Sequence, residues 1–116
     1  MTNKEFKVIN LTPHEVTVFL KDDTDLSKAM VIPPSGEVAR CEQKDVFMGI
    51  ISGIPIYKSD LGDVKNLPDS QDDTIYLVST PVAEKMKAVR DDLYVPAGFV
   101  RNERGQIQGC TFLAKH

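Results

Sequence analysis

Short apolar runs with a period of two recur along the N-terminal half of the chain, which is typical of β-strands. Strands are expected in this half at residues 6–9, 16–20, 30–32 and 38–41. The first two flank a five-residue turn, Asn10-Leu11-Thr12-Pro13-His14. Pro33-Pro34-Ser35-Gly36 is a strong turn signal after the third strand.

A β-hairpin is predicted in the middle of the chain, where residues 50–51 and 54–57 flank Ser52-Gly53. Pro55 has no N–H to give to a strand ladder, so we expect it on an edge strand or at a bulge. Residues 61–73 are acidic and rich in turn formers, and the pattern predicts a loop there.

The clearest strand lies at residues 74–79, and its continuous apolar run predicts burial on both faces. A helix should follow over about residues 80–90, with Thr80 as its N-cap and Pro81 at its first position. One face of this helix would carry Val82, Met86 and Val89. Later strands are expected at residues 93–95, 99–101 and 106–113, with a hairpin turn at residues 103–105.

These elements predict a single α+β domain over residues 1–116, made mainly of antiparallel sheet with one principal helix packed on it. The chain has 116 residues and no internal repeat or linker, which suits one domain. A chain this short buries a modest share of its surface, so self-association is a reasonable way to gain buried area.

Charge and composition narrow the function classes. The net charge is −3, without the basic excess that DNA-binding and RNA-binding proteins usually show. No stretch approaches the length of a membrane span, and the N-terminal MTNKEFK lacks the apolar region of a signal peptide. The two cysteines lie far apart in sequence, so reduced thiols and a cytoplasmic location are expected.

Residue patterns give little support to catalysis or to a metal site. A zinc site needs three or four nitrogen or sulfur ligands at recognisable spacing, whereas His14, Cys41, Cys110 and His116 are isolated from one another. The chain has no nucleophile elbow, neither of the two His-x-Thr motifs that some phosphodiesterases need and no phosphate-binding glycine loop. We therefore predict no catalytic residue, metal or cofactor. His14 either caps backbone groups of its turn or contacts a ligand.

Arginines near the C-terminus are better candidates for binding. Arg90, Arg101 and Arg104 all follow the predicted helix, and a guanidinium suits bidentate contact with phosphate. The alternative is a set of surface ion pairs with neighbouring carboxylates, each worth little. Asn102 stands beside Arg101 and could read the edge of a base.

Aromatic residues close to these arginines could stack on a nucleobase, although core packing stays open for each. The predicted ligand-binding residues are Thr12, His14, Tyr76, Arg90, Phe99, Arg101, Asn102 and Arg104.

The order of short motifs along nearly the whole chain resembles a family of small phage and prophage proteins. The motifs are NLTPH at residues 10–14, IPPSGEVAR at 32–40, LP at 67–68, TIYLVS at 74–79, RDDL at 90–93, VRN at 100–102 and GQIQGC at 105–110. This family is similar to the Thoeris anti-defence proteins of the first type.

The resemblance implies a sponge in the cytoplasm of an infected bacterium. Such a protein binds the cyclic ADP-ribose signal made by a bacterial TIR protein and holds it without cleaving it. It also implies a homo-oligomer, at least a dimer, with nucleotide pockets at subunit boundaries. Some members bind cyclic oligonucleotides at separate sites. Two other functions stay open, an enzyme that degrades such a signal and a protein-binding inhibitor of a host protein.

Overall fold

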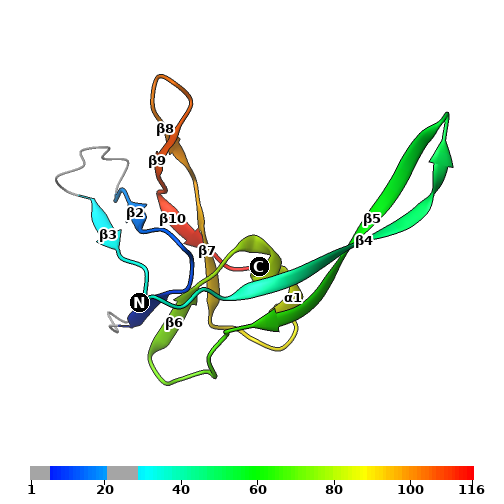
Figure 1. Cartoon of the computed structure of the whole chain (residues 1–116). Helices are drawn as coiled ribbons and strands as arrows, with labels where there is room; N and C mark the ends of the chain where they lie inside the picture. The colour runs from blue at the N-terminus through cyan, green and yellow to red at the C-terminus, as the bar shows by residue number, and fades with distance from the viewer. Residues whose placement is uncertain (1–5, 21–28) are drawn as a thin grey trace.

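A computed structural model describes residues 6–20 and 29–116 of the chain (Figure 1). The elements are β1 (Lys7–Asn10), β2 (Val16–Val18), β3 (Met30–Ile32), β4 (Arg40–Ile51), β5 (Ile54–Lys65), β6 (Thr74–Leu77), α1 (Thr80–Met86), β7 (Leu93–Ala97), β8 (Val100–Arg101), β9 (Ile107–Gly109) and β10 (Phe112–Ala114). These elements confirm an α+β fold made mostly of strands, with one helix among the described residues.

A four-stranded sheet in the order β1-β6-β7-β10 lies at the centre of the fold. Strands β1, β6 and β7 run parallel, and only β10 is antiparallel, pairing with β7. The sequence predicts mainly antiparallel sheet but does not reveal the parallel pairings of the central sheet. Between β6 and β7 the parallel pairing is possible because α1 carries the chain across as a crossover. Strand pairs β2–β3, β4–β5 and β8–β9 are antiparallel as expected.

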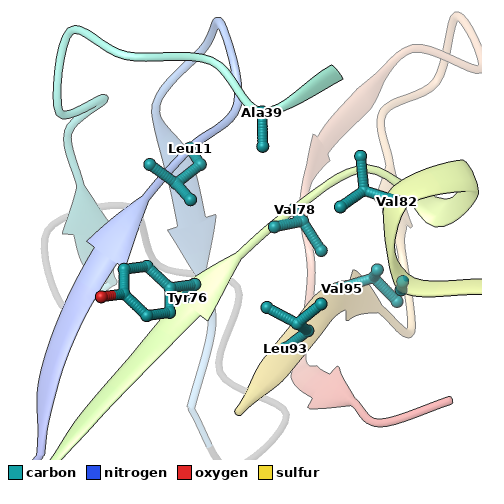
Figure 2. Packing of buried hydrophobic residues seen from close by; sticks show 8 residues of the cluster. Leu11, Ala39, Tyr76, Val78, Val82, Leu93 and Val95 are labelled. Carbon is teal, nitrogen blue, oxygen red and sulfur yellow. The ribbon is translucent and has the colours of Figure 1, made fainter. Parts of the chain in front are cut away.

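Strand β6 is buried on both faces, which confirms the prediction made from its apolar run. Tyr76 packs into a first cluster that includes residues of α1 and Ala39, the residue before β4. Leu77 packs into a second cluster that includes residues of β2. Figure 2 shows the first cluster around β6 and β7; its buried members are Leu11, Ala39, Tyr76, Val78, Val82, Ala83, Leu93 and Val95. The second contains Val16, Val18, Leu77 and Cys110.

Helix α1 is shorter than the predicted helix, and its cap is one residue earlier. Ser79 is the N-cap, Thr80 begins the helix, and the last turn ends at Met86. The amide N–H groups of Val89 and Arg90 both donate to the Met86 carbonyl, at 3.0 and 2.9 Å, which closes the helix in a turn. Val89 is consequently 71% exposed rather than part of the buried face.

Three loop and strand boundaries also differ from the prediction. The first five residues of the expected loop at 61–73 belong to β5, because they pair with β4. The expected last strand at 106–113 is two strands, β9 and β10, separated by Cys110 and Thr111. Pro96 and Ala97, which fall in the expected gap between the strands at residues 93–95 and 99–101, belong to β7.

The β4–β5 hairpin, which we call the arm, extends away from the rest of the molecule (Figure 1). Its turn residues Ser52 and Gly53 have φ angles of 51° and 79°, as a two-residue hairpin turn requires. Cys41 and Val64 at its base pack against the first cluster. Pro55 lies on β5, which pairs only with β4 among the described residues, so the edge position predicted for Pro55 is confirmed.

Candidate functional site

The hairpin formed by β8 and β9 holds three of the predicted ligand-binding residues. The Asn102 side-chain oxygen accepts the amide N–H groups of Arg104 and Gln106 at 2.9 and 3.0 Å. Arg101 donates from Nη1 to the Gly105 carbonyl at 2.7 Å. These bonds shape the turn, and Gly105 supplies the φ of +78° that the turn needs.

Both polar atoms of the Asn102 amide are used inside this turn. Its oxygen accepts the two backbone N–H groups, and Nδ2 donates to the Gln106 Oε1 at 3.0 Å. An amide held in this way fixes the shape of a binding surface more readily than it reads a base edge. The structure therefore places Asn102 at the predicted site but gives its side chain a turn-forming contact.

Arg101 and Arg104 line one open hollow of about 540 Å³ at the tip of the hairpin. Its size falls within the range of about 300–1,000 Å³ that small-molecule sites occupy. The Arg104 guanidinium forms no ion pair or hydrogen bond within the described part of the chain. Two arginines therefore line the same hollow, with Glu103 as the acidic residue beside them.

Phe99 borders a second, smaller hollow of about 170 Å³ next to the first. Phe99 is 53% exposed. Pro96 and Ile107 are apolar residues that line the same hollow. Gln108 lines both hollows, so they adjoin along β9. The structure thus brings together Phe99, Arg101, Asn102 and Arg104, four of the eight predicted residues.

Arg90 and Tyr76 lie apart from this hairpin, and each takes the structural alternative. Arg90 donates from Nε and Nη2 to the two carboxylate oxygens of Asp92, both at 2.9 Å. The guanidinium carbon lies 5.8 Å from the centre of the Tyr76 ring. Tyr76 is fully buried and donates its hydroxyl to the Asp69 carbonyl at 3.0 Å. A core ring has no face free for a nucleobase, so we leave Tyr76 and Arg90 out of the candidate site.

The Arg90–Asp92 pair makes the stability of the fold depend on pH. Burial acts to raise the pKa of the Asp92 carboxyl, but hydrogen bonds from Arg90 and Ser70 outweigh it, so the pKa lies below its ordinary value. A carboxyl with a lowered folded pKa stabilises the fold at pH values above its unfolded pKa, near 3.9, and this contribution is lost as the pH falls through the folded pKa.

We therefore expect Asp92→Asn to lower the free energy of unfolding by about 1–2 kcal/mol at pH 7 and by less below about pH 4. Urea unfolding of both proteins from pH 7 to pH 3, followed by circular dichroism, measures this difference. Asp91→Asn is the matched control, because the neighbouring Asp91 side chain forms no hydrogen bond or ion pair with the part of the chain that the structure describes. An equal loss for Asp92→Asn at every pH would contradict the assigned role.

Thr12 and His14 stay in the turn between β1 and β2. The Thr12 hydroxyl lies 2.6 Å from the Asn10 side-chain oxygen and 2.9 Å from the His14 carbonyl. His14 takes part through this carbonyl, while its exposed side chain lines neither of the two hollows on β9. Backbone groups of the turn are capped by the side chains of Asn10 and Thr12, while the hydrogen bonds described for His14 use its carbonyl and not its ring. The ligand contact of His14 stays a prediction.

The sequence reasoning missed a third hollow, of about 330 Å³, at the base of the arm. Arg40, Gln43, Ser79 and Thr12 give it polar groups. Two backbone hydrogen bonds hold the three segments around this hollow together. The amide N–H of Ala39 donates to the Leu11 carbonyl at 3.0 Å, and the amide N–H of Leu11 donates to the Leu77 carbonyl at 2.9 Å. The signal in the sequence was Arg40 at the end of the IPPSGEVAR motif.

Comparisons with models of known protein families, with curated proteins and with solved structures each found no match. The resemblance drawn from the motif order therefore stays a prediction. Among the described residues, no three His, Cys, Asp or Glu side chains are grouped as metal ligands would be. None of the described helices is long and apolar enough to cross a membrane.

Proposed function

We propose that this protein binds a small cyclic nucleotide signal, of the cyclic ADP-ribose kind, and sequesters it without cleaving it. The observation that carries the proposal is a pair of hollows that share Gln108 on β9, one lined by Arg101 and Arg104 and the other by the exposed Phe99. Arg101 and Arg104 suit a pyrophosphate, and Phe99 suits the face of a base. The setting would be the cytoplasm of a bacterium infected by a phage.

A sponge needs tight binding and no chemistry. It must outcompete the receptor of the signal, so a dissociation constant near 1 nM is expected, which corresponds to about −12 kcal/mol. Both hollows are open to solvent, and a ligand of nucleotide size would need more cover to lose most of its hydration. The proposed homo-oligomer, at least a dimer, would supply that cover if a second subunit faces the hairpin.

Calorimetry with isomers of cyclic ADP-ribose tests this function. We expect binding by at least one isomer, and we expect heat denaturation of the complex to release the same isomer intact, as chromatography would show. A changed ligand would instead indicate the enzyme that degrades the signal. If no isomer binds, the sponge proposal fails, and a protein-binding inhibitor becomes the better hypothesis.

Substitution of the two arginines locates the site. Loss of a charge-assisted hydrogen bond should weaken binding by about 10- to 100-fold for Arg101→Ala and for Arg104→Ala. Both side chains belong to an exposed turn, so the melting temperature of the free protein should change little. Arg40→Ala is the matched control, because it removes an arginine from the hollow at the base of the arm. Loss of binding in Arg40→Ala alone would move the site there.

A further inference from the structure

The outer half of the arm, residues 46–57, exposes an unusual amount of apolar surface. It carries no charged residue. All but one of its large apolar residues are between 41% and 65% exposed, and Ile56 is half-buried. The exposed ones are Val46, Phe47, Met48, Ile50, Ile51, Ile54 and Tyr57. Large contiguous apolar patches are rare on monomeric proteins and mark interaction sites. This half of the arm is therefore an interaction surface.

Apolar residues occupy both faces of this ribbon. Phe47 pairs with Tyr57 and Ile50 with Pro55, and since Pro55 and Tyr57 are two residues apart on β5, these pairs share one face. The Phe47 and Tyr57 rings meet edge to face with centres 5.5 Å apart. Ile51, Ile54 and Ile56 belong to the opposite face.

A two-stranded ribbon that is exposed to water on both faces is not expected to be stable by itself, because an isolated hairpin is marginally stable at best. Contacts between the body and the arm lie near its base, where Cys41 and Val64 pack against the first cluster and Lys85 of α1 donates to the Leu61 carbonyl at 3.3 Å. Figure 1 shows the outer half clear of every other element. Its cover must come from another molecule.

The size of the exposed surface matches what a stable dimer requires. The chain exposes 8376 Å², whereas a folded monomer of its mass exposes about 6,300 Å² on average. Its radius of gyration is 17.1 Å, against about 13 Å for a compact domain of this length. The excess over the whole chain is about 2,000 Å², which is more than the roughly 800 Å² that each partner buries in a standard interface, so the chain has surface enough for such an interface.

The charge of the arm suits a second copy of the same chain. Residues 40–65 contain four basic and four acidic side chains, which are Arg40, Lys44, Lys58 and Lys65, and Glu42, Asp45, Asp60 and Asp63. Glu42 and Lys65 form an ion pair at 2.8 Å across the base. The arm is thus neutral. Two copies can therefore approach each other through their arms without the electrostatic repulsion expected between surfaces that carry the net charge of −3 of the whole chain.

The two edges of the arm are poorly suited to adding another strand. Pro55 removes one N–H from β5, and the register shift between Phe47 and Gly49 leaves Met48 as a bulge on β4. Proline and bulges are the devices that keep sheet edges from pairing. The apolar faces, rather than the edges, are the parts that can be covered.

We propose that the outer half of the arm is the surface through which two copies of this chain associate, face against apolar face. The inference does not depend on the nucleotide proposal, because it rests on the arm alone. A failed calorimetric titration would leave it standing, and a monomeric protein would leave the titration result standing.

An arm-shortened variant tests the inference by molar mass. Replacing residues 44–60 with Asn-Gly lets the opposed pair Gln43 and Leu61 flank a two-residue turn and keeps the base of the arm. In light scattering after size-exclusion chromatography at about 50 µM, we expect at least two chains for the native protein and one chain for this variant.

Point substitutions in the full-length arm test the same inference if the arm-shortened variant does not fold. The pair Ile50→Glu and Ile54→Glu, one residue from each face, should also give a single chain. Val89→Glu, at an apolar position that is 71% exposed on the body, should keep the native mass. A native protein that is monomeric at about 50 µM overturns the inference, and its binding to neutral phosphatidylcholine vesicles would assign the arm to a lipid surface.

Fluorescence gives an independent readout, because the chain has no tryptophan. In Phe47→Trp the emission should be that of a buried indole at high protein concentration and should shift to the red on dilution. Val89→Trp should show the emission of an exposed indole at every concentration. Red emission from both variants at all concentrations would contradict an arm covered by a second copy.

Discussion

Asn10→Ala should lower the free energy of unfolding by about 3 kcal/mol. Asn10 is 1% exposed, and its Nδ2 donates to the carbonyls of His14 and Ile32 at 2.9 and 3.1 Å. Its Oδ1 accepts the amide N–H of Thr12 at 2.9 Å. Alanine would remove the partner of the Thr12 amide N–H and of the Ile32 carbonyl, and it would leave the His14 carbonyl with the Thr12 hydroxyl alone. Each group left unsatisfied in a partly buried place costs about 1–3 kcal/mol.

Urea unfolding followed by circular dichroism measures this loss, best in the arm-shortened variant, where self-association would not alter the apparent stability. Thr12→Val is the matched control. It removes the hydroxyl that bonds to Asn10 but keeps the backbone N–H, so it should cost about 1 kcal/mol. If Asn10→Ala costs no more than Thr12→Val, the amide does not hold β1, β2 and β3 together.

This amide also explains the NLTPH motif. Asn10 ends β1, and its side chain reaches the backbone on both sides of the turn and the end of β3. Thr12 adds its hydroxyl to the same network, and His14 contributes its carbonyl. The motif is therefore accounted for by the requirements of a turn that joins three strands, without a chemical role for the histidine ring.

Local features of the fold could be predicted from the sequence, and features that depend on distant pairing could not. The Ser52-Gly53 turn and the two buried faces of β6 follow from residues next to one another. The parallel pairing of β1 with β6 joins residues more than sixty positions apart, and no local pattern reports it. Residues 61–65 read as a loop because Gly62 and Asp63 are turn formers, whereas their pairing with β4 and the packing of Val64 against the first cluster depend on distant residues.

The same distinction applies to the candidate site. Phe99, Arg101, Asn102 and Arg104 come together because one short hairpin carries them all. Arg90 is instead bound to Asp92, two residues away. The sequence shows that the two residues are close, but it does not show that both Nε and Nη2 of the guanidinium donate to this carboxylate. The hollow beside Arg40 escaped notice because it is built from three segments that are distant in sequence.

Gly109→Ala should also lower the free energy of unfolding by about 3 kcal/mol, because β9 lies against β2 with no room for a side chain. A Cβ at Gly109 would lie 2.7 Å from the Thr17 carbonyl oxygen and 2.7 Å from a ring carbon of Phe19, which is fully buried. That carbonyl accepts the amide N–H of Cys110 at 2.9 Å, and the Cys110 carbonyl accepts that of Phe19 at 2.8 Å. Moving the strands apart to admit a methyl group would weaken both bonds.

Urea unfolding again gives the measurement, with Gly62→Ala as the control. Gly62 is also a strand glycine, but its Cβ would come no closer than 3.1 Å to the Cβ of Glu42 and 3.4 Å to the Glu42 carbonyl oxygen, against 2.7 Å at Gly109. A smaller loss, of about 1 kcal/mol, is therefore expected. Adding Phe19→Leu to Gly109→Ala should not restore stability, because the Thr17 carbonyl oxygen stays in place. Full recovery in that double variant would show that the ring alone limits the space, and that β9 is free to move relative to β2.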